Sequence, residues 1–283
     1  MEEPEPSQSA LPVGLYEHTT GEDEPCRHPK RSRLLGQPEG FGRHVVDVLT
    51  AGGHDVVPIS RSSGVDVVTG ERLAEALAGV ACIIDAATQP SPDEEAATAF
   101  FTASARNLQE VGEQTGVEQI VVVSIIRIDR FTAGFLAAKA VHERVMLSGP
   151  IPVRILRAAQ FHEFVPEVVE WARQGDVSYV PRMRTQLVAA RTVAEALADL
   201  ATGSGPARGS PGPPFPEIAG PREENFVDIA KLLVARRGDP VRIEGVSNPA
   251  DPDRDLYETG ALLPGPDATL AGPTFEEWLD STS

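Results

Sequence analysis

The chain has 283 residues, of which 41% are hydrophobic and 24% charged, and its formal net charge is −17 at pH 7. This length accommodates one sizeable α/β domain with an appendage, or two small domains. The negative charge argues against a nucleic-acid partner and against docking on anionic lipid, because both require a basic surface. A small anionic cofactor remains compatible with it, because helix dipoles and single arginines act locally.

Cysteine usage and the first residues indicate the compartment. Of the two cysteines, Cys26 lies in a polar segment and Cys82 in the apolar run "ACIIDAA". We therefore expect no disulfide framework, and a reducing cytoplasm fits best. The start "MEEPEPSQS" lacks the features of a secretory signal, and no stretch approaches the ~18 apolar residues of a membrane span. The histidines are dispersed without metal-ligand spacing, so no metal is expected.

Residues 1–33 are rich in glutamate, proline and serine, and we expect an irregular leader there. From Gly42 onward, segments with helical spacing alternate with extended apolar segments. Helices are expected over 43–51, 70–80 and 91–116, and strands over 54–60 and 81–87. Ser91 is expected to cap the third helix, with Pro92 at its first position.

The strongest strand signal covers residues 117–126, and a helix over 133–149 and a strand over 151–159 follow it. Strands separated by helices of this length are typical of βαβ units with a parallel sheet. Beyond Ala158 the pattern loosens. We expect a helix over 161–175, a short strand followed by a helix within 186–202, a strand stub followed by a helix within 217–238, and a Pro/Gly loop over 203–216. A final amphipathic helix over 274–281 would dock Phe275 and Trp278.

These elements predict an α/β fold: a Rossmann-type doubly wound parallel sheet with a small C-terminal α/β lid region. Residues 34–158 would form the dinucleotide-binding core. Residues 159–283 would form a substrate and lid region that completes the fold at the carboxyl edge of the sheet, where open α/β sheets bind ligands.

The stretch "LLGQPEGFGRHVV" contains the candidate phosphate loop. In a dinucleotide-binding turn the first glycine permits the tight turn, the second lets the backbone approach the pyrophosphate, and the third allows close helix packing. Gly36 and Gly42 suit the first and last roles. Glu39 stands where the second glycine belongs, with Gly40 one residue late, and no convincing apolar strand precedes the motif. An ordinary glycine-rich helix start is the alternative interpretation.

Two arginines are candidate phosphate ligands. The expected strand over 54–60 is followed by Arg61 at the position where an acid would bind a ribose 2′-hydroxyl, which favours NADP(H) over NAD(H). Arg43, next to the last glycine, could be a second ligand. Ala86 and Ala87 are small residues where the chain would pass close to a flat cofactor. The alternatives are solvated surface cations and simple sheet packing.

Ser124 lies at the carboxyl end of the strongest strand, and Phe135 and Lys139 share one face of the following helix. With these residues the chain resembles the atypical, extended short-chain dehydrogenases/reductases, in the NAD(P)H-binding branch that includes NmrA-like and isoflavone-reductase-like proteins. The resemblance covers about residues 36–283. It is carried by "GRHVVDVL", "IIDAAT", "VVVSII", "FLAAKAVHE", "VRILRAAQFHEF" and the tail "GPTFEEWL".

The resemblance implies a serine and a Tyr-x-x-x-Lys pair as site residues. Ser124 and Lys139 match, but Phe135 stands where the tyrosine belongs, and a phenyl ring cannot transfer a proton. Isoflavone-reductase-like relatives rely on the lysine, which holds the nicotinamide ribose or acts as general acid/base. The resemblance also places Gln160 and His162 beside nicotinamide and substrate. His162 could serve as proton donor, or it could be an ordinary packed loop histidine.

These observations predict an NAD(P)H-dependent reductase of a small organic substrate, quinone-like or aromatic, that lacks the usual catalytic tyrosine. Two alternatives stay open: a non-catalytic NAD(P)-binding sensor or regulatory protein, and an inactive relative whose first strand is impaired or replaced by residues 1–35. We expect a cytoplasmic monomer or homodimer whose partner is a small molecule, with no nucleic-acid or membrane partner.

Overall fold

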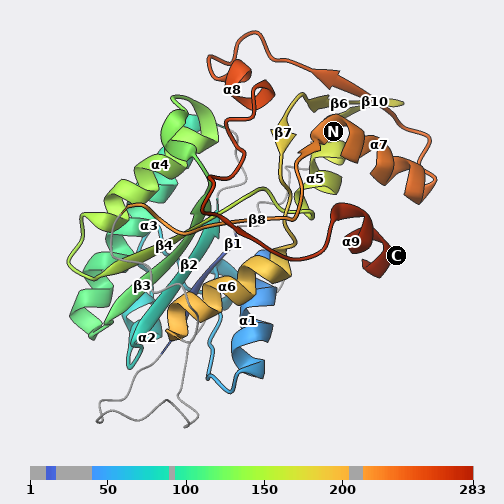
Figure 1. Ribbon diagram of the computed structural model, residues 1–283. Helices are drawn as coiled ribbons and strands as arrows, with labels where there is room; N and C mark the ends of the chain where they lie inside the picture. Colours follow the sequence, from blue (N-terminus) through green and yellow to red (C-terminus); the bar gives the residue numbers. More distant parts are fainter. Residues whose placement is uncertain (1–10, 17–39, 89–92, 204–212, 283) are drawn as a thin grey trace, which may run out of the picture. The chain divides into compact units, whose positions relative to one another are not determined.

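The computed structural model describes residues 11–16, 40–88, 93–203 and 213–282 (Figure 1). Its main sheet has the strand order β1-β2-β3-β4-β8-β11, and the five strands after β1 are parallel. The expected α/β class with a parallel sheet is confirmed. The strands are β1 (Leu11–Tyr16), β2 (Cys82–Thr88), β3 (Gln119–Ile125), β4 (Val153–Ala158), β8 (Glu217–Ala219) and β11 (Thr269–Leu270).

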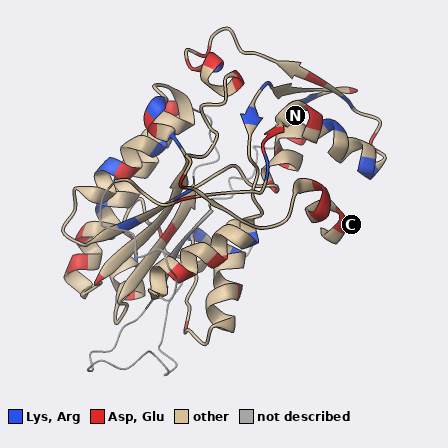
Figure 2. Cartoon of the chain, in the orientation of Figure 1, with Lys and Arg blue, Asp and Glu red and all other residues tan. Residues whose placement is uncertain are grey.

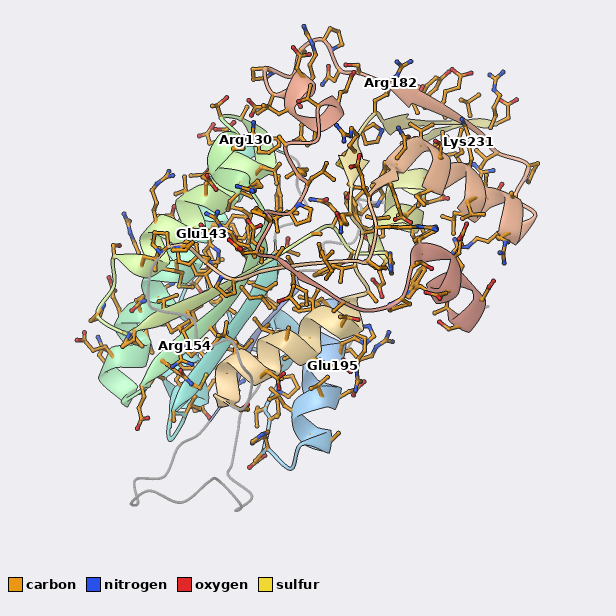
Figure 3. The ribbon with its side chains drawn as sticks, in the orientation of Figure 1. Arg130, Glu143, Arg154, Arg182, Glu195 and Lys231 are labelled. Carbon is orange, nitrogen blue, oxygen red and sulfur yellow. The ribbon has the colours of Figure 1, made fainter. Side chains whose placement is uncertain are left out.

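The helices of the described chain follow the expected order, except that the short helix over 254–258 was not expected. They are α1 (Phe41–Ala51), α2 (Leu73–Leu77), α3 (Glu94–Thr115), α4 (Gly134–Leu147), α5 (Phe164–Trp171), α6 (Ala190–Thr202), α7 (Phe226–Arg237), α8 (Arg254–Glu258) and α9 (Phe275–Thr282). Acidic and basic residues are interspersed along these helices (Figure 2). Exposed pairs at helical spacing include Arg191 and Glu195 on α6, 2.9 Å apart, and Glu195 is labelled in Figure 3. Such pairs contribute little to stability.

Two smaller sheets were not expected from the sequence. One has the order β10-β6-β5, and the other pairs β7 with β9. Their strands are β5 (Arg173–Gln174), β6 (Val177–Pro181), β7 (Arg184–Thr185), β9 (Glu224–Asn225) and β10 (Arg242–Val246). Most of these strands are short, and β6 and β10 are parallel partners 60 and more residues apart. A pairing this distant in sequence leaves no local periodicity to detect.

The expected strand over residues 54–60 is not formed, and only an isolated bridge at Ile59 falls in that segment. Pro58 has no backbone N–H, so it cannot donate to a sheet ladder. Residues 61–63 form a 3₁₀ turn that ends at Gly64. Similarly, the strand expected before α6 is reduced to an isolated bridge between Val188 and Phe161.

The cap of α3 also differs from the expectation. Asp93 is the N-cap residue, and its carboxylate accepts a hydrogen bond from the Ala96 N–H at 2.8 Å. Ser91 is therefore not the cap, and Pro92 does not open the helix. Both lie outside the described residues. Asp93 places Glu94 and Glu95 in the first turn, where the helix dipole favours acids.

Six residues of the expected irregular leader form strand β1, which pairs with β2 in antiparallel orientation. Tyr16, the last residue of β1, pairs with Cys82, the first residue of β2. β1 therefore ends at the amino edge of the parallel strands, whereas the strand that feeds a dinucleotide-binding loop ends at their carboxyl edge. Residues 17–39, which directly precede the glycine-rich turn, lie outside the described residues.

The chain divides into two compact units. The first unit consists of residues 1–122 and 141–154, and the second of residues 123–140 and 155–283, so that the boundaries pass through β3 and β4. The core of the first unit includes Leu49, Leu73, Ile83, Phe101 and Leu108, all fully buried. The second unit has its own apolar cluster, which includes Val165, Val180, Phe226, Leu233 and Phe275.

Helix α9 docks within the second unit as expected from its sequence. Phe275 is fully buried in the apolar cluster of that unit, and Trp278 packs against the same cluster. The rings of Phe275 and Trp278 lie 5.4 Å apart. Burial of two aromatic side chains stabilises a helix that is too short to persist alone.

Candidate functional site

The glycine-rich start of α1 belongs to the first unit. Gly40 precedes the helix with φ of 89°, a left-handed conformation that favours glycine, and Phe41 and Gly42 are buried. Among the described residues, no side chain caps this helix and no acid lies in its first turn. Its first amides therefore keep a positive dipole end, beside which Arg43 is exposed. Gly36 and Glu39 lie outside the described residues.

Arg61 opens a turn that the neighbouring serines organise. The Ser60 N–H donates to Ser63 Oγ at 2.9 Å, and Ser63 Oγ donates back to the Ser60 carbonyl at 2.7 Å. The hydroxyl oxygens of Ser60 and Ser62 lie 2.7 Å apart. Arg61 is exposed at the first position of this turn. The segment that was expected to end a strand is thus a self-bonded turn that presents an arginine.

At its carboxyl end, β2 leaves its neighbour. β2 pairs with β3 from Cys82 to Asp85, and Ala86 and Ala87 continue without partners on β3. The Ala87 N–H instead donates to the Asp85 carboxylate at 2.9 Å. Both alanines are buried.

The carboxylate of Asp85 also contacts a histidine that sequence reasoning missed. His142 Nε2 lies 3.0 Å from Asp85 Oδ2, and both side chains are fully buried. The His142 ring lies 4.9 Å from that of Phe101. One signal was available in the sequence: Asp85 interrupts a strand that is otherwise apolar, and a buried carboxylate requires a partner.

Ser124 and Lys139 belong to the second unit, and both are buried, with 3% and 5% of their surface exposed. Lys139 Nζ donates to the Val123 carbonyl at 3.2 Å. Ser124 Oγ is buried with no hydrogen-bond partner among the described residues. Such an orphaned hydroxyl is costly unless a ligand or water satisfies it. Ser124 therefore lies at the carboxyl end of β3, as the sequence predicted, and Lys139 contacts the same strand from α4.

Phe135 lies on α4, one turn before Lys139, and is half-buried against the apolar cluster of the second unit. Its ring provides packing but no proton. The position at which the sequence resemblance implies a tyrosine is thus occupied by a purely apolar side chain.

Gln160 and Phe161 follow β4 and are half-buried. The carbonyl oxygen of the Gln160 side chain accepts a hydrogen bond from the Thr185 hydroxyl at 2.8 Å. The backbone of Gln160 also accepts from the Val188 N–H at 3.0 Å. Gln160 is consequently fixed by the segment around β7.

The structure does not support His162 as the proton donor. Its side chain is fully buried, Nε2 lies 3.1 Å from the Pro273 carbonyl, and the rings of Phe275 and Trp278 lie 5.4 and 5.5 Å away. Burial lowers the pKa of His162 to about 4. The ring is therefore neutral near pH 7, and its Nε2–H is used by Pro273. His162 anchors the C-terminal segment.

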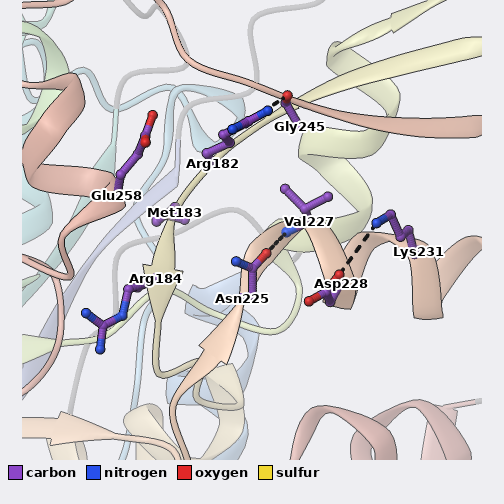
Figure 4. Close-up of a pocket in the computed structure, with 9 residues that line it drawn as sticks. All are labelled: Arg182, Met183, Arg184, Asn225, Val227, Asp228, Lys231, Gly245 and Glu258. Carbon is purple, nitrogen blue, oxygen red and sulfur yellow. Dashed lines mark hydrogen bonds and ion pairs between the residues drawn. The ribbon is translucent and has the colours of Figure 1, made fainter.

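A pocket of about 460 Å³ lies in the second unit, between β7, β9, β10 and the start of α7 (Figure 4). Its basic side chains bind acceptors within the protein. Arg182 Nε donates to the Gly245 carbonyl at 3.1 Å, Arg184 Nε donates to Glu223 at 2.6 Å, and Lys231 lies 3.5 Å from Asp228. Arg182 and Lys231 are also labelled in Figure 3. Charged side chains of both signs line the pocket, and no motif in the sequence pointed to it.

Within the described ranges, no group of three or more histidine, cysteine, aspartate or glutamate residues could hold a metal ion. In the same part of the chain, no helix is both long and apolar enough to span a bilayer.

Comparison with known proteins places the fold. No protein-family model and no curated protein matches the chain. A short-chain dehydrogenase/reductase superfamily protein from Agrobacterium tumefaciens with bound NAD is similar in structure, with a TM-score of 0.58, 15% identity, and coverage of 87% of this chain and 94% of that one. The triphenylmethane reductase of Citrobacter sp. complexed with NADP(H) gives a TM-score of 0.58 at 15% identity, with coverage of 85% of this chain and 95% of that one.

The NAD-dependent NDP-hexosamine 5,6-dehydratase TunA gives a TM-score of 0.56 at 16% identity, with coverage of 86% of this chain and 95% of that one. At such identities the likeness concerns the fold. The chain therefore has the Rossmann-type fold found in a short-chain dehydrogenase/reductase superfamily protein.

Proposed function

We propose that this protein is an NAD(P)H-dependent oxidoreductase of the atypical short-chain dehydrogenase/reductase type, related to the NmrA-like and isoflavone-reductase-like branch. It reduces a small organic substrate, quinone-like or aromatic, in the cytoplasm, as a monomer or homodimer. The observation that carries the proposal is the burial of two polar residues, Lys139 on α4 and Ser124 at the end of β3. The Ser124 hydroxyl has no hydrogen-bond partner among the described residues. Similar folds hold NAD or NADP(H) in two of the compared structures.

Each of the two units, taken by itself, offers groups that suit part of a dinucleotide. The start of α1 offers amides without a side-chain cap, which suits a pyrophosphate. Ala86 and Ala87 offer small side chains at the end of β2. Ser124 Oγ is a buried hydroxyl that a ligand can satisfy. When bound, the cofactor supplies the hydride.

The chain's own residues then bind, orient and protonate. Lys139 donates one hydrogen bond to the Val123 carbonyl. Lys139 would also hold a ribose hydroxyl and would deliver a proton to the reduced substrate, because Phe135 cannot. Ser124 Oγ would hold the substrate oxygen. Gln160, whose side chain is fixed by Thr185, would lie beside the substrate.

We further propose a preference for NADP(H) over NAD(H). Arg61 is exposed at the head of a turn whose serine hydroxyls are already hydrogen-bonded within the turn. A guanidinium in such a position suits a 2′-phosphate, which accepts bidentate hydrogen bonds. Arg43 would act as a second phosphate ligand.

Titration of the protein with NADPH, followed by calorimetry, tests the proposal. We expect wild-type binding, oxidation of NADPH at 340 nm with a quinone panel, and loss of at least ~10² in turnover for Lys139→Met. Lys231→Met is the matched control for cofactor binding, because Lys231 is an exposed lysine paired with Asp228. Absence of NADPH and NADH binding by the wild-type protein would refute the proposal.

Two observations favour a second candidate, a non-catalytic dinucleotide-binding protein. Phe135 removes the usual proton donor, and β1 runs antiparallel to β2 rather than leading into the glycine-rich turn. NADPH binding by the wild-type protein without any turnover on the substrate panel would favour this candidate. An inactive relative with an impaired first strand would bind neither nucleotide.

A further inference from the structure

Beyond Asp85, β2 keeps its pairing with β1, where Thr88 lies opposite Leu11, but it loses its pairing with β3. Ladder pairing between β2 and β3 stops at Asp85, so the Ala87 N–H has no β3 acceptor. The Asp85 carboxylate accepts from this N–H at 2.9 Å, two residues along the same chain. A buried amide must be paired, and here one carboxylate oxygen fixes its direction.

The second oxygen of the same carboxylate faces α4, in an ion-pair contact whose geometry falls outside that of a hydrogen bond. Asp85 Oδ2 lies 3.0 Å from His142 Nε2, with both side chains fully buried. Phe101 of α3 packs against the His142 ring at 4.9 Å. The carboxylate therefore cannot rotate away from the Ala87 amide without breaking the contact with His142.

A buried pair of this kind is a poor stabiliser, because desolvation offsets most of the attraction. Gln109, elsewhere in the same unit, shows what a purely structural buried polar residue does there. Its side chain accepts from the Ile151 N–H at 2.9 Å and donates to the Met146 carbonyl at 2.7 Å. It links α3 to the segment after α4, far along the chain from the glycine-rich turn and the end of β2.

We propose that Asp85 and His142 form a positioning pair that holds the Ala86–Ala87 backbone in the conformation that receives the dinucleotide. This inference rests on the proposed function. The pair sets the path of β2 where it leaves β3, and α4, which supplies His142, also carries Lys139 three residues earlier. One helix thus carries both the lysine of the proposed site and the histidine that holds the carboxylate.

Four variants test the pair, each measured for NADPH affinity by calorimetry and for unfolding by denaturant. Asp85→Ala and His142→Ala should weaken NADPH binding by about 10-fold or more. Asp85→Ala removes the acceptor of the Ala87 amide, and His142→Ala leaves the Asp85 carboxylate without its contact on α4. Asp85→Asn keeps an acceptor for the amide and should return the affinity to within about 3-fold of wild type. Gln109→Met should lower stability but leave the affinity unchanged.

The outcomes separate the two proposals. If the wild-type protein binds no nucleotide, the proposed function and the positioning pair both fall. If wild type binds and Asp85→Ala binds equally well, the pair alone is wrong. Equal losses of affinity in Gln109→Met and Asp85→Ala would also overturn it, because the effect would then be general loosening of the unit. Should Asp85→Ala not fold, the NADPH affinity of His142→Ala decides. If His142→Ala binds NADPH as tightly as wild type and Asp85→Asn do, the positioning pair is wrong.

Discussion

His162 shows how burial determines the chemistry of a single side chain. Its ring is enclosed by Phe275 and Trp278, and the Pro273 carbonyl lies 3.1 Å from Nε2. The carbonyl accepts the Nε2–H of the neutral ring, so the folded protein excludes a second proton from this site. The unfolded chain has no such restriction, and a pH dependence of stability follows.

The pKa of His162 is lowered from 6.5 to about 4 in the folded protein. The unfolded chain therefore binds a proton at His162 more readily than the folded protein does. The contribution of His162 to the free energy of unfolding is intact above pH 6.5 and is lost as pH falls toward 4. His162→Gln removes this titration while keeping a donor for Pro273. Wild type should lose on the order of 3 kcal/mol relative to the variant over that interval. Denaturant unfolding at several pH values measures it, and parallel curves for both proteins would contradict the assignment.

Arg61 determines the expected nucleotide preference. Arg61→Asp places a carboxylate at the head of the Ser60–Gly64 turn, where it repels a 2′-phosphate and can bind a ribose 2′-hydroxyl. We expect the variant to bind NADPH at least ~10-fold more weakly while NADH affinity changes little. Calorimetric titration with each nucleotide checks this. Equal effects on both nucleotides would mean that Arg61 is a surface cation.

Helix α3 illustrates how local chemistry sets the limits of an element. Two residues in "SPDEE" could cap it, and the helix begins after the second, because Asp93 reaches the Ala96 amide at 2.8 Å. Gly116 ends the helix in a left-handed conformation. Sequence reasoning chose Ser91 because Pro92 suits a first helical position, and that choice was wrong.

The two candidate caps differ in a measurable way. Asp93→Ala should lower the free energy of unfolding by about 1 kcal/mol, because it leaves the Ala96 amide without its side-chain acceptor. Ser91→Ala, its matched control, should change stability by less than ~0.5 kcal/mol. Urea unfolding of the two variants compares them directly. A larger loss for Ser91→Ala would return the cap to the serine.

At the scale of the whole molecule, the main sheet depends on a strand from the first residues of the chain. β1 pairs with β2 along its length, from Leu11 opposite Thr88 to Tyr16 opposite Cys82. On its other side β2 pairs with β3. Without β1, the edge of a buried apolar strand would be open to solvent and to other chains.

A variant lacking residues 1–16 should therefore unfold at lower denaturant concentration and self-associate. We expect a loss of at least ~2 kcal/mol, since several backbone pairs would be removed. A variant lacking residues 1–10 retains β1 and should remain close to wild type in both respects. Denaturant unfolding and light scattering measure the two effects. Identical behaviour of the two variants would show that β1 contributes nothing to the sheet.

The sequence by itself determined the α/β class and the helices and strands with strong periodicity. β2, β3 and β4 are largely apolar strands, and Phe275 and Trp278 lie on one face of α9, so local pattern was sufficient there. It also located Ser124 and Lys139 at the end of β3 and on the helix that follows. Such residues are identified by their position after a strong strand, without knowledge of distant contacts.

Tertiary structure alone decided the remainder. The antiparallel direction of β1, the pairing of β6 with β10, the enclosure of His162 by α9, and the contact of Asp85 with His142 all join segments far apart in the sequence. Burial and partners set the charge state of such groups, and neither is encoded in the neighbouring residues. This is why His162 looked like a proton donor in the sequence and became an anchor in the fold.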